Sequence, residues 1–238
     1  MEKELALLVE RLRQTGQNNL VSVILYGSGA TGEYRKKHSD LNVLCLVARL
    51  EASDLAQLAP AFAWWIRRGH VAPLVFAREE LVRAADIYAI ELLDMKSAHR
   101  VLWGEDALKN LDVPMTLHAQ QVERDLRNAL VRLRESALAA GNRERHLRAL
   151  VVDSVSSFAA LFRHALIALG KTPPATRREA FDQLAATLGF DAAPFHAALD
   201  VRDGKRKESE MDAANVFAAY LASVTKATEE MDARLASK

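Results

Sequence analysis

The sequence predicts an α+β fold in which a small mixed sheet with flanking helices is followed by an all-helical bundle. Two runs rich in apolar residues, 20–26 and 40–47, are bounded by turn residues and predict buried strands. From residue 114 onward no run has the character of a strand, and long helical patterns fill the chain. We therefore expect two domains, 1–113 and 114–238.

The first domain is expected to alternate helices and strands. Leu5, Leu8, Val9 and Leu12 recur at helical spacing, which predicts an opening amphipathic helix over residues 2–14. The other expected elements are a helix at 53–68, an edge strand at 71–77 that contains Pro73, a helix at 78–85, a segment at 88–95 that fits strand or helix, and a last strand at 100–103.

The second domain is expected to be helical throughout. Thr176 and Glu179 have the spacing of a capping box, and Gly189 follows as a helix stop. The expected helices are 116–140, 143–169, 176–188, a short one near 194–199, and 211–236. The last of these is long and amphipathic, which permits a homodimer without requiring one.

Composition and charge exclude several classes of protein. The formal net charge of +1 gives no overall basic field, and the three tryptophans are not interleaved with basic residues, so we expect no nucleic-acid partner. No apolar run approaches the ~20 residues that span a bilayer, so we expect no membrane partner. The single cysteine, Cys45, lies in an apolar run and is expected to be a buried thiol. The first residues lack the pattern of a signal peptide, and a cytoplasmic location is expected.

The most informative stretch is Leu25-Tyr26-Gly27-Ser28-Gly29, which is followed by Asp40-Leu41-Asn42 at the start of the next strand. A serine after a glycine in a tight turn can offer its hydroxyl and its backbone N–H to a phosphate. Side chains at i and i+2 of a strand point to the same face, so Asp40 and Asn42 are expected to act together.

This pattern resembles the signature of the DNA-polymerase-beta-like nucleotidyltransferase superfamily, in which a Gly-Ser turn precedes an Asp-x-Asp pair. The resemblance implies an NTP substrate and Mg²⁺, with Gly27 and Ser28 contacting phosphate and Asp40 binding metal. It also implies Asp40 and Asn42 as the catalytic pair. The basic residues Lys36, Lys37 or Arg35 of the intervening loop would add phosphate contacts.

Asn42 stands where the resembled family has a second aspartate. An asparagine offers a carbonyl oxygen but no charge, so a site for two divalent ions lacks one negative charge. The family also supplies a third carboxylate from a later strand, and 71–77 contains none. Glu79 and Glu80 follow that segment, and Glu91 or Asp94 could serve if 88–95 is a strand. We expect the fold to be kept and the two-metal chemistry to be weakened or lost.

The helical half resembles the helical domains of kanamycin nucleotidyltransferase and HEPN proteins. HEPN ribonucleases carry an Arg, a short polar spacer and a His, whereas Arg202 here is followed by Lys207 and no histidine. A lysine does not titrate near neutrality as a general base must, so we expect no ribonuclease activity.

Three functions stay open at this point. The first is nucleotidyl transfer to an unknown acceptor, either a small molecule or a protein. The second is an inactive pseudo-enzyme that senses a nucleotide or binds a partner protein. The third is a component of a toxin–antitoxin pair.

Overall fold

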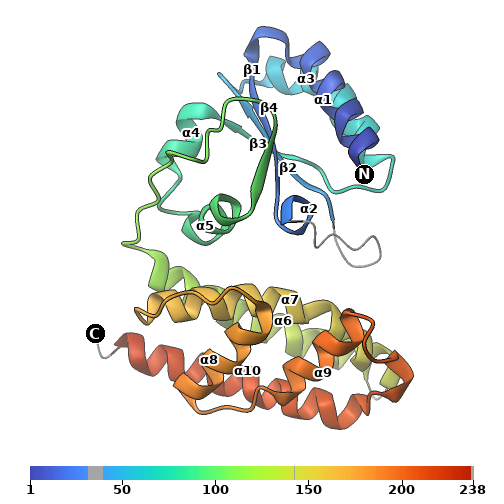
Figure 1. The fold of residues 1–238 in the computed structure, drawn as a ribbon, viewed down its shortest axis with the longest axis vertical. Coiled ribbons are helices and arrows are strands. Elements are labelled where there is room, and N and C mark those ends of the chain that lie inside the picture. Colours follow the sequence, from blue (N-terminus) through green and yellow to red (C-terminus); the bar gives the residue numbers. More distant parts are fainter. Residues whose placement is uncertain (32–39, 142, 237–238) are drawn as a thin grey trace. The chain divides into compact units, whose positions relative to one another are not determined.

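The computed structural model describes residues 1–31, 40–141 and 143–236. The chain divides into two compact units, Met1–Thr116 and Leu117–Lys238, which we describe separately (Figure 1).

The first unit is built around a four-stranded mixed sheet with the order β3-β2-β1-β4. Its strands are β1 (Leu20–Tyr26), β2 (Asn42–Val47), β3 (Leu74–Ala77) and β4 (His99–Gly104). β1 is antiparallel to both β2 and β4, and β2 is parallel to β3. The predicted edge position of the third strand is confirmed. The strand is shorter than expected because it begins only after Pro73, which has no N–H to donate.

Helices cover both faces of this sheet. Figure 1 shows α1 (Glu2–Gly16) and α3 (Ala52–Ile66) on one face, and α4 (Arg78–Arg83) and α5 (Ala89–Ser97) on the other. The segment at 88–95, which fitted either strand or helix, therefore forms a helix. Two short helices complete the unit: η1 (Gln17–Asn19) precedes β1, and α2 (Ser28–Thr31) follows it.

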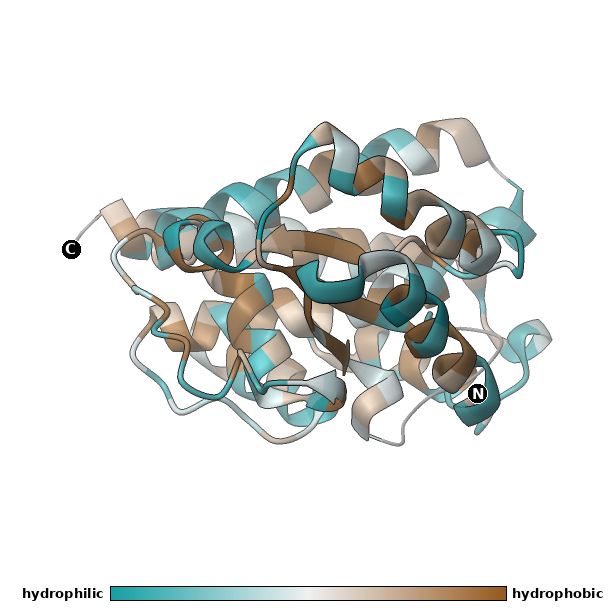
Figure 2. Cartoon of the chain, turned by 90° about the horizontal axis from the view of Figure 1, so that it is seen from above, coloured by the Kyte–Doolittle hydropathy of each residue, from teal (hydrophilic) through white to brown (hydrophobic). Residues whose placement is uncertain are grey.

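The central strands are buried on both sides, and Figure 2 shows them as a brown, hydrophobic layer. On the α1 and α3 side the core includes Leu8, Leu25, Val43, Cys45 and Trp65. On the α4 and α5 side it includes Ile24, Leu44, Leu46, Leu81 and Leu92. Neighbouring residues of a strand alternate between these two cores, as the two-residue period of a strand requires. Burial on both sides explains why these strands read as continuous apolar runs.

β4 is joined to β1 through a glycine that no other residue could replace without strain. Gly104 has φ +81° and pairs with Ser22 in the sheet. A Cβ atom added at Gly104 would lie 2.2 Å from the carbonyl oxygen of Val21. Both the backbone conformation and the available space therefore require glycine here.

The second unit is a bundle of helices: α6 (His118–Ala140), α7 (Glu144–Ala168), α8 (Arg177–Leu188), α9 (Ala193–Arg202), the one-turn η2 (Glu208–Glu210) and α10 (Ala213–Ala236). α7 contacts α6, α8, α9 and α10. Its Phe158 and Phe162 anchor a cluster of aromatic rings in which Phe181 and Phe195 stack 4.6 Å apart. The predicted capping box of α8 is present, with Thr176 accepting from the Glu179 N–H.

Among the described residues, α7 has the length and apolar composition of a helix that could cross a membrane. The sequence predicted this helix at 143–169 but no run long enough to span a membrane, because Asp153 and Arg163 interrupt its apolar residues. Half of its most apolar window is buried within the structure. A core helix of a bundle meets the same criteria, and the contacts of α7 with four other helices are those of a core helix.

Candidate functional site

The candidate site begins at the glycine turn that ends β1. Gly27 has φ +71°, a left-handed conformation that favours glycine. Its N–H donates to the Ala98 carbonyl at 2.9 Å, and its carbonyl accepts from the Ala30 N–H at 2.9 Å. The half-buried Ser28 follows as the first residue of α2. The turn is therefore held on one side by the backbone before β4 and on the other by α2.

The structure brings this turn next to Asn42, one member of the predicted pair. Asn42 opens β2 and pairs with Tyr26, the last residue of β1. A Cβ added to Gly27 would lie 3.5 Å from the Asn42 amide nitrogen. Asp40 is exposed two residues earlier, and Leu41 between them is buried in the core beneath α1 and α3. Strand alternation therefore directs Asn42 toward the other face of the sheet. The sequence predicted a strand from residue 40, but β2 begins at Asn42, so Asp40 lies just before the strand.

Tyr26 is a site residue that the sequence reading did not identify. It lies between Asn42 of β2 and His99 of β4, and directly paired residues place their side chains on the same face. Burial, together with the negative charge of Glu91 on α5, raises the pKa of the Tyr26 phenol to about 12. The hydroxyl therefore keeps its proton at neutral pH. Its position next to Gly27 was the only signal in the sequence that could have singled it out.

The structure shows which element carries each candidate for the third carboxylate. β3 itself contains no acid. Glu79 and Glu80 follow Ala77, which pairs with Val47 at the far end of β2. About 16 Å of strand separates that end from Asn42. Neither glutamate can complete the site, because each lies at the wrong end of the parallel pair.

Glu91 and Asp94 lie on α5 and not on a strand. Glu91 is close enough to raise the pKa of Tyr26, which places its charge near the site end of β1. No group of three or more His, Cys, Asp or Glu side chains within residues 1–31, 40–141 and 143–236 is arranged to hold a metal ion. The predicted pair contributes one carboxylate, Asp40, and a neutral amide, Asn42, and this pair alone does not fit two divalent ions.

The remaining predicted contacts lie outside the described part of the chain. Lys36 and Lys37, predicted to bind phosphate, and their neighbour Arg35 all fall within 32–39.

Comparison with known proteins rests on structure. No protein-family model matches the chain, and no curated protein matches its sequence. The structure is similar to that of spectinomycin adenyltransferase AAD(9) from Enterococcus faecialis, solved with ATP and spectinomycin, with a TM-score of 0.62 and 15% identity over 98% of this chain and 99% of that one. A toxin–antitoxin structure with AMP-PNP matches 52% of this chain and 93% of its own, at 17% identity and a TM-score of 0.32.

The first similarity extends over nearly the whole chain and shows the fold. The chain has a nucleotidyltransferase fold followed by a helical C-terminal region, so the fold that the motif implied is confirmed. The second similarity is too low to carry an argument.

Proposed function

We propose that the first unit binds a nucleoside triphosphate at the Gly27–Ser28 turn and that nucleotidyl transfer from it is weak or lost. The binding half is supported by the turn geometry, since a left-handed residue in a turn can aim successive backbone N–H groups at an anion. It is also supported by the similarity in fold to an adenyltransferase solved with ATP. Lys36 and Lys37 would add cationic contacts to the phosphates.

The main observation that supports a loss of transfer is the neutral Asn42 beside the turn. The neighbouring strand β3 contains no acidic residue that could replace the missing charge. In nucleotidyl transfer an acceptor oxygen attacks the α-phosphorus and pyrophosphate leaves with its negative charge. That charge must be neutralised in the transition state by positioned groups. Asn42 supplies a dipole in place of a carboxylate, so the described part of this site lacks one of the charged groups that would assemble such a centre.

Replacing Asn42 by aspartate tests both halves of the proposal. We expect Asn42→Asp to strengthen the Mg²⁺-dependent part of ATP binding about tenfold, because it adds a second carboxylate two residues from Asp40. Titration calorimetry with ATP, with and without Mg²⁺, measures this difference.

The matched control is Asn18→Asp, which adds the same charge on exposed η1 before the opposite end of β1. Equal gains in the two variants would show a nonspecific charge effect and contradict the assignment of the site. Absence of ATP binding in all three proteins would reject the binding half.

A second candidate is nucleotidyl transfer to a small molecule. The observation that favours it is the coverage of the match, which includes the helical half of a neighbour solved with both ATP and spectinomycin. Transfer of label from α-³²P-ATP to a panel of hydroxyl-bearing small molecules, lost in Asp40→Ala, would establish this activity and overturn the proposal of an inactive site.

A further inference from the structure

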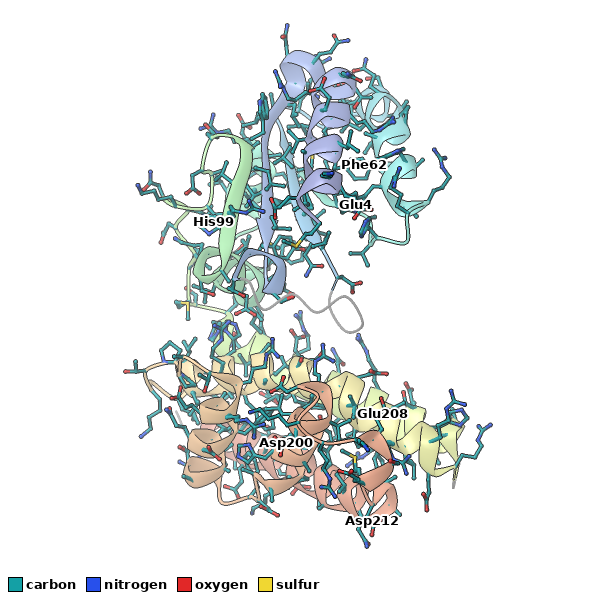
Figure 3. All side chains as sticks on the ribbon, turned by 45° about the vertical axis from the view of Figure 1, so that its right-hand side comes forward. Glu4, Phe62, His99, Asp200, Glu208 and Asp212 are labelled. Carbon is teal, nitrogen blue, oxygen red and sulfur yellow. The ribbon has the colours of Figure 1, made fainter. Side chains whose placement is uncertain are left out.

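His99 lies at the same end of the sheet as the glycine turn, and both of its ring nitrogens are engaged. It opens β4 beside Tyr26, and its side chain is 15% exposed (Figure 3). Nδ1 lies 3.1 Å from the carbonyl oxygen of Lys96, at the end of α5. Nε2 lies 3.0 Å from Oδ1 of Asp106, in the segment after β4.

Both partners of the His99 ring are hydrogen-bond acceptors. A carbonyl oxygen and an ionised carboxylate can accept a hydrogen bond but cannot donate one. Asp106 Oδ1 also accepts from the backbone N–H of Lys109 at 3.1 Å. Each nitrogen of His99 must therefore carry a proton for both bonds to form. A neutral ring would leave one nitrogen lone pair facing an oxygen lone pair.

The residue before His99 holds the glycine turn. The Ala98 carbonyl accepts the Gly27 N–H at 2.9 Å, and Tyr26 pairs with His99 itself. The His99 ring thus links Lys96 of α5 and Asp106 after β4 to the residue next to Ala98, whose carbonyl holds the turn. Loss of the proton breaks one of these two links, because only one N–H remains.

Two neighbouring cations have partners of their own. Lys96 of α5 donates an ammonium N–H to the Leu111 carbonyl, and Arg100 of β4 pairs with Glu2 at 2.9 Å. Tyr26 of β1 keeps its proton, since burial and Glu91 raise its pKa to about 12. Histidine is the side chain that ordinarily changes charge between about pH 5 and pH 8.

We propose that His99 is a protonation-dependent positioning residue for the Gly27 turn, so that nucleotide binding weakens when its ring loses a proton. The positioning role stands on the geometry alone, whereas the effect on nucleotide rests on the proposed function.

The experiment reads the two parts separately. ¹⁵N NMR of the full chain follows the ring nitrogens of His99 and the backbone amide of Gly27 between about pH 6 and pH 8. Calorimetry with ATP follows binding over the same range. The variants are His99→Gln and Asp106→Asn, and the second keeps the proposal testable if the first does not fold. His146→Gln, on an exposed site of α7, is the matched control.

We expect both ring nitrogens of His99 to be protonated at the lower pH, and the Gly27 amide to shift as one proton leaves. ATP affinity should fall about threefold or more over this range in the wild type and in His146→Gln, in line with loss of a charge-assisted hydrogen bond. It should fall clearly less in the other two variants. Comparing variants at each pH cancels the titration of ATP itself.

If the chemical shift of the Gly27 amide stays constant while the ring of His99 loses a proton, the positioning role is wrong. It is also wrong if the pH dependence of ATP affinity is the same in His99→Gln and Asp106→Asn as in the wild type. If no ATP binds at either pH, the proposed function fails, and the Gly27 amide still decides the positioning role.

Discussion

At the scale of single residues, Cys45 shows how position in a strand controls reactivity. It lies in β2, paired with Val23, and its side chain is fully buried between the sheet and the helices α1 and α3. This burial raises the pKa of the thiol to about 12. The sequence reading of a buried structural thiol is therefore confirmed.

We expect Cys45 not to react with a thiol reagent at about pH 8 in the folded protein, because the thiolate is the reactive form. In denaturant the same thiol should react readily. The absorbance of the chromophore that the reagent releases measures the reaction rate in the folded and in the denatured protein. Similar rates in the two states would contradict the burial of Cys45.

Tyr26 gives a pH-dependent prediction. Since its pKa is raised by burial and by Glu91, the folded state holds the phenolic proton more tightly than the unfolded chain does. Tyr26 therefore stabilises the fold below about pH 10, and this contribution is lost as pH rises from there toward 12. We expect Glu91→Gln to lower the pKa of Tyr26 by removing the negative charge.

Ultraviolet absorbance of tyrosinate, taken as the difference from Tyr26→Phe, isolates this titration. Glu79→Gln, at the opposite end of the sheet, is the control. If Glu91→Gln and Glu79→Gln lowered the pKa of Tyr26 equally, the charge of Glu91 would not be the local cause of the raised pKa.

At the scale of elements, the junction of β4 with β1 depends on Gly104. We expect Gly104→Ala to destabilise the protein by at least ~2 kcal/mol, because alanine is strained at φ +81° and its Cβ would clash with the Val21 carbonyl. Denaturant unfolding measures the loss.

Gly189→Ala separates the two causes of that loss. Gly189 also has a positive φ, +75°, in the left-handed helical region, but nothing lies within 4 Å of an added Cβ. This substitution should destabilise the protein by only about 1 kcal/mol, from the backbone conformation alone. Equal costs at the two glycines would show that the close approach at Gly104 contributes nothing.

The elements that could be predicted from sequence are those that local chemistry specifies. Residues 20–26 form the expected strand, and Thr176 with Glu179 caps the expected helix. The segment at 88–95 could not be assigned, because a short apolar run fits a buried helix and a strand equally well. It became α5 through packing on the sheet, which no local pattern encodes.

The candidate site was predictable to the same extent. The turn at Gly27 and the pair at Asp40 and Asn42 are contiguous motifs, and the structure places Gly27 beside Asn42. Tyr26 acquires its neighbour His99 only through the register of β4 on β1, more than seventy residues apart in the chain. Register depends on the whole sheet, so a reading of separate segments could not find His99.

At the scale of the whole molecule, each unit has its own core and its own spectroscopic signal. Trp64, Trp65 and Trp103 all belong to the first unit. They pack in or against its core, and Arg11 and Arg68 lie 4.6 Å from the centre of the Trp64 ring. Tryptophan fluorescence therefore reports on the first unit, while the long helices of the second contribute strongly to circular dichroism.

We expect Phe162→Ala to destabilise the second unit by about 3–5 kcal/mol, because this buried ring contacts Phe158, Phe181 and Phe195. The helical transition in circular dichroism should move to lower denaturant while the fluorescence transition stays in place. Leu138→Ala, at a side chain that is 83% exposed, should move neither. If fluorescence moved together with circular dichroism in Phe162→Ala, the two units would unfold as one.

The strand order β3-β2-β1-β4 gives the sheet two outer rims, and each rim carries a feature that discourages another chain from adding a strand. β3 is four residues long and is preceded by Pro73, which interrupts the row of donors that an incoming strand would need. β4 presents the charge of Arg100, which an incoming apolar strand would have to bury. Both features lower the tendency of an edge strand to pair with another chain, and on the β3 side the feature is one proline residue.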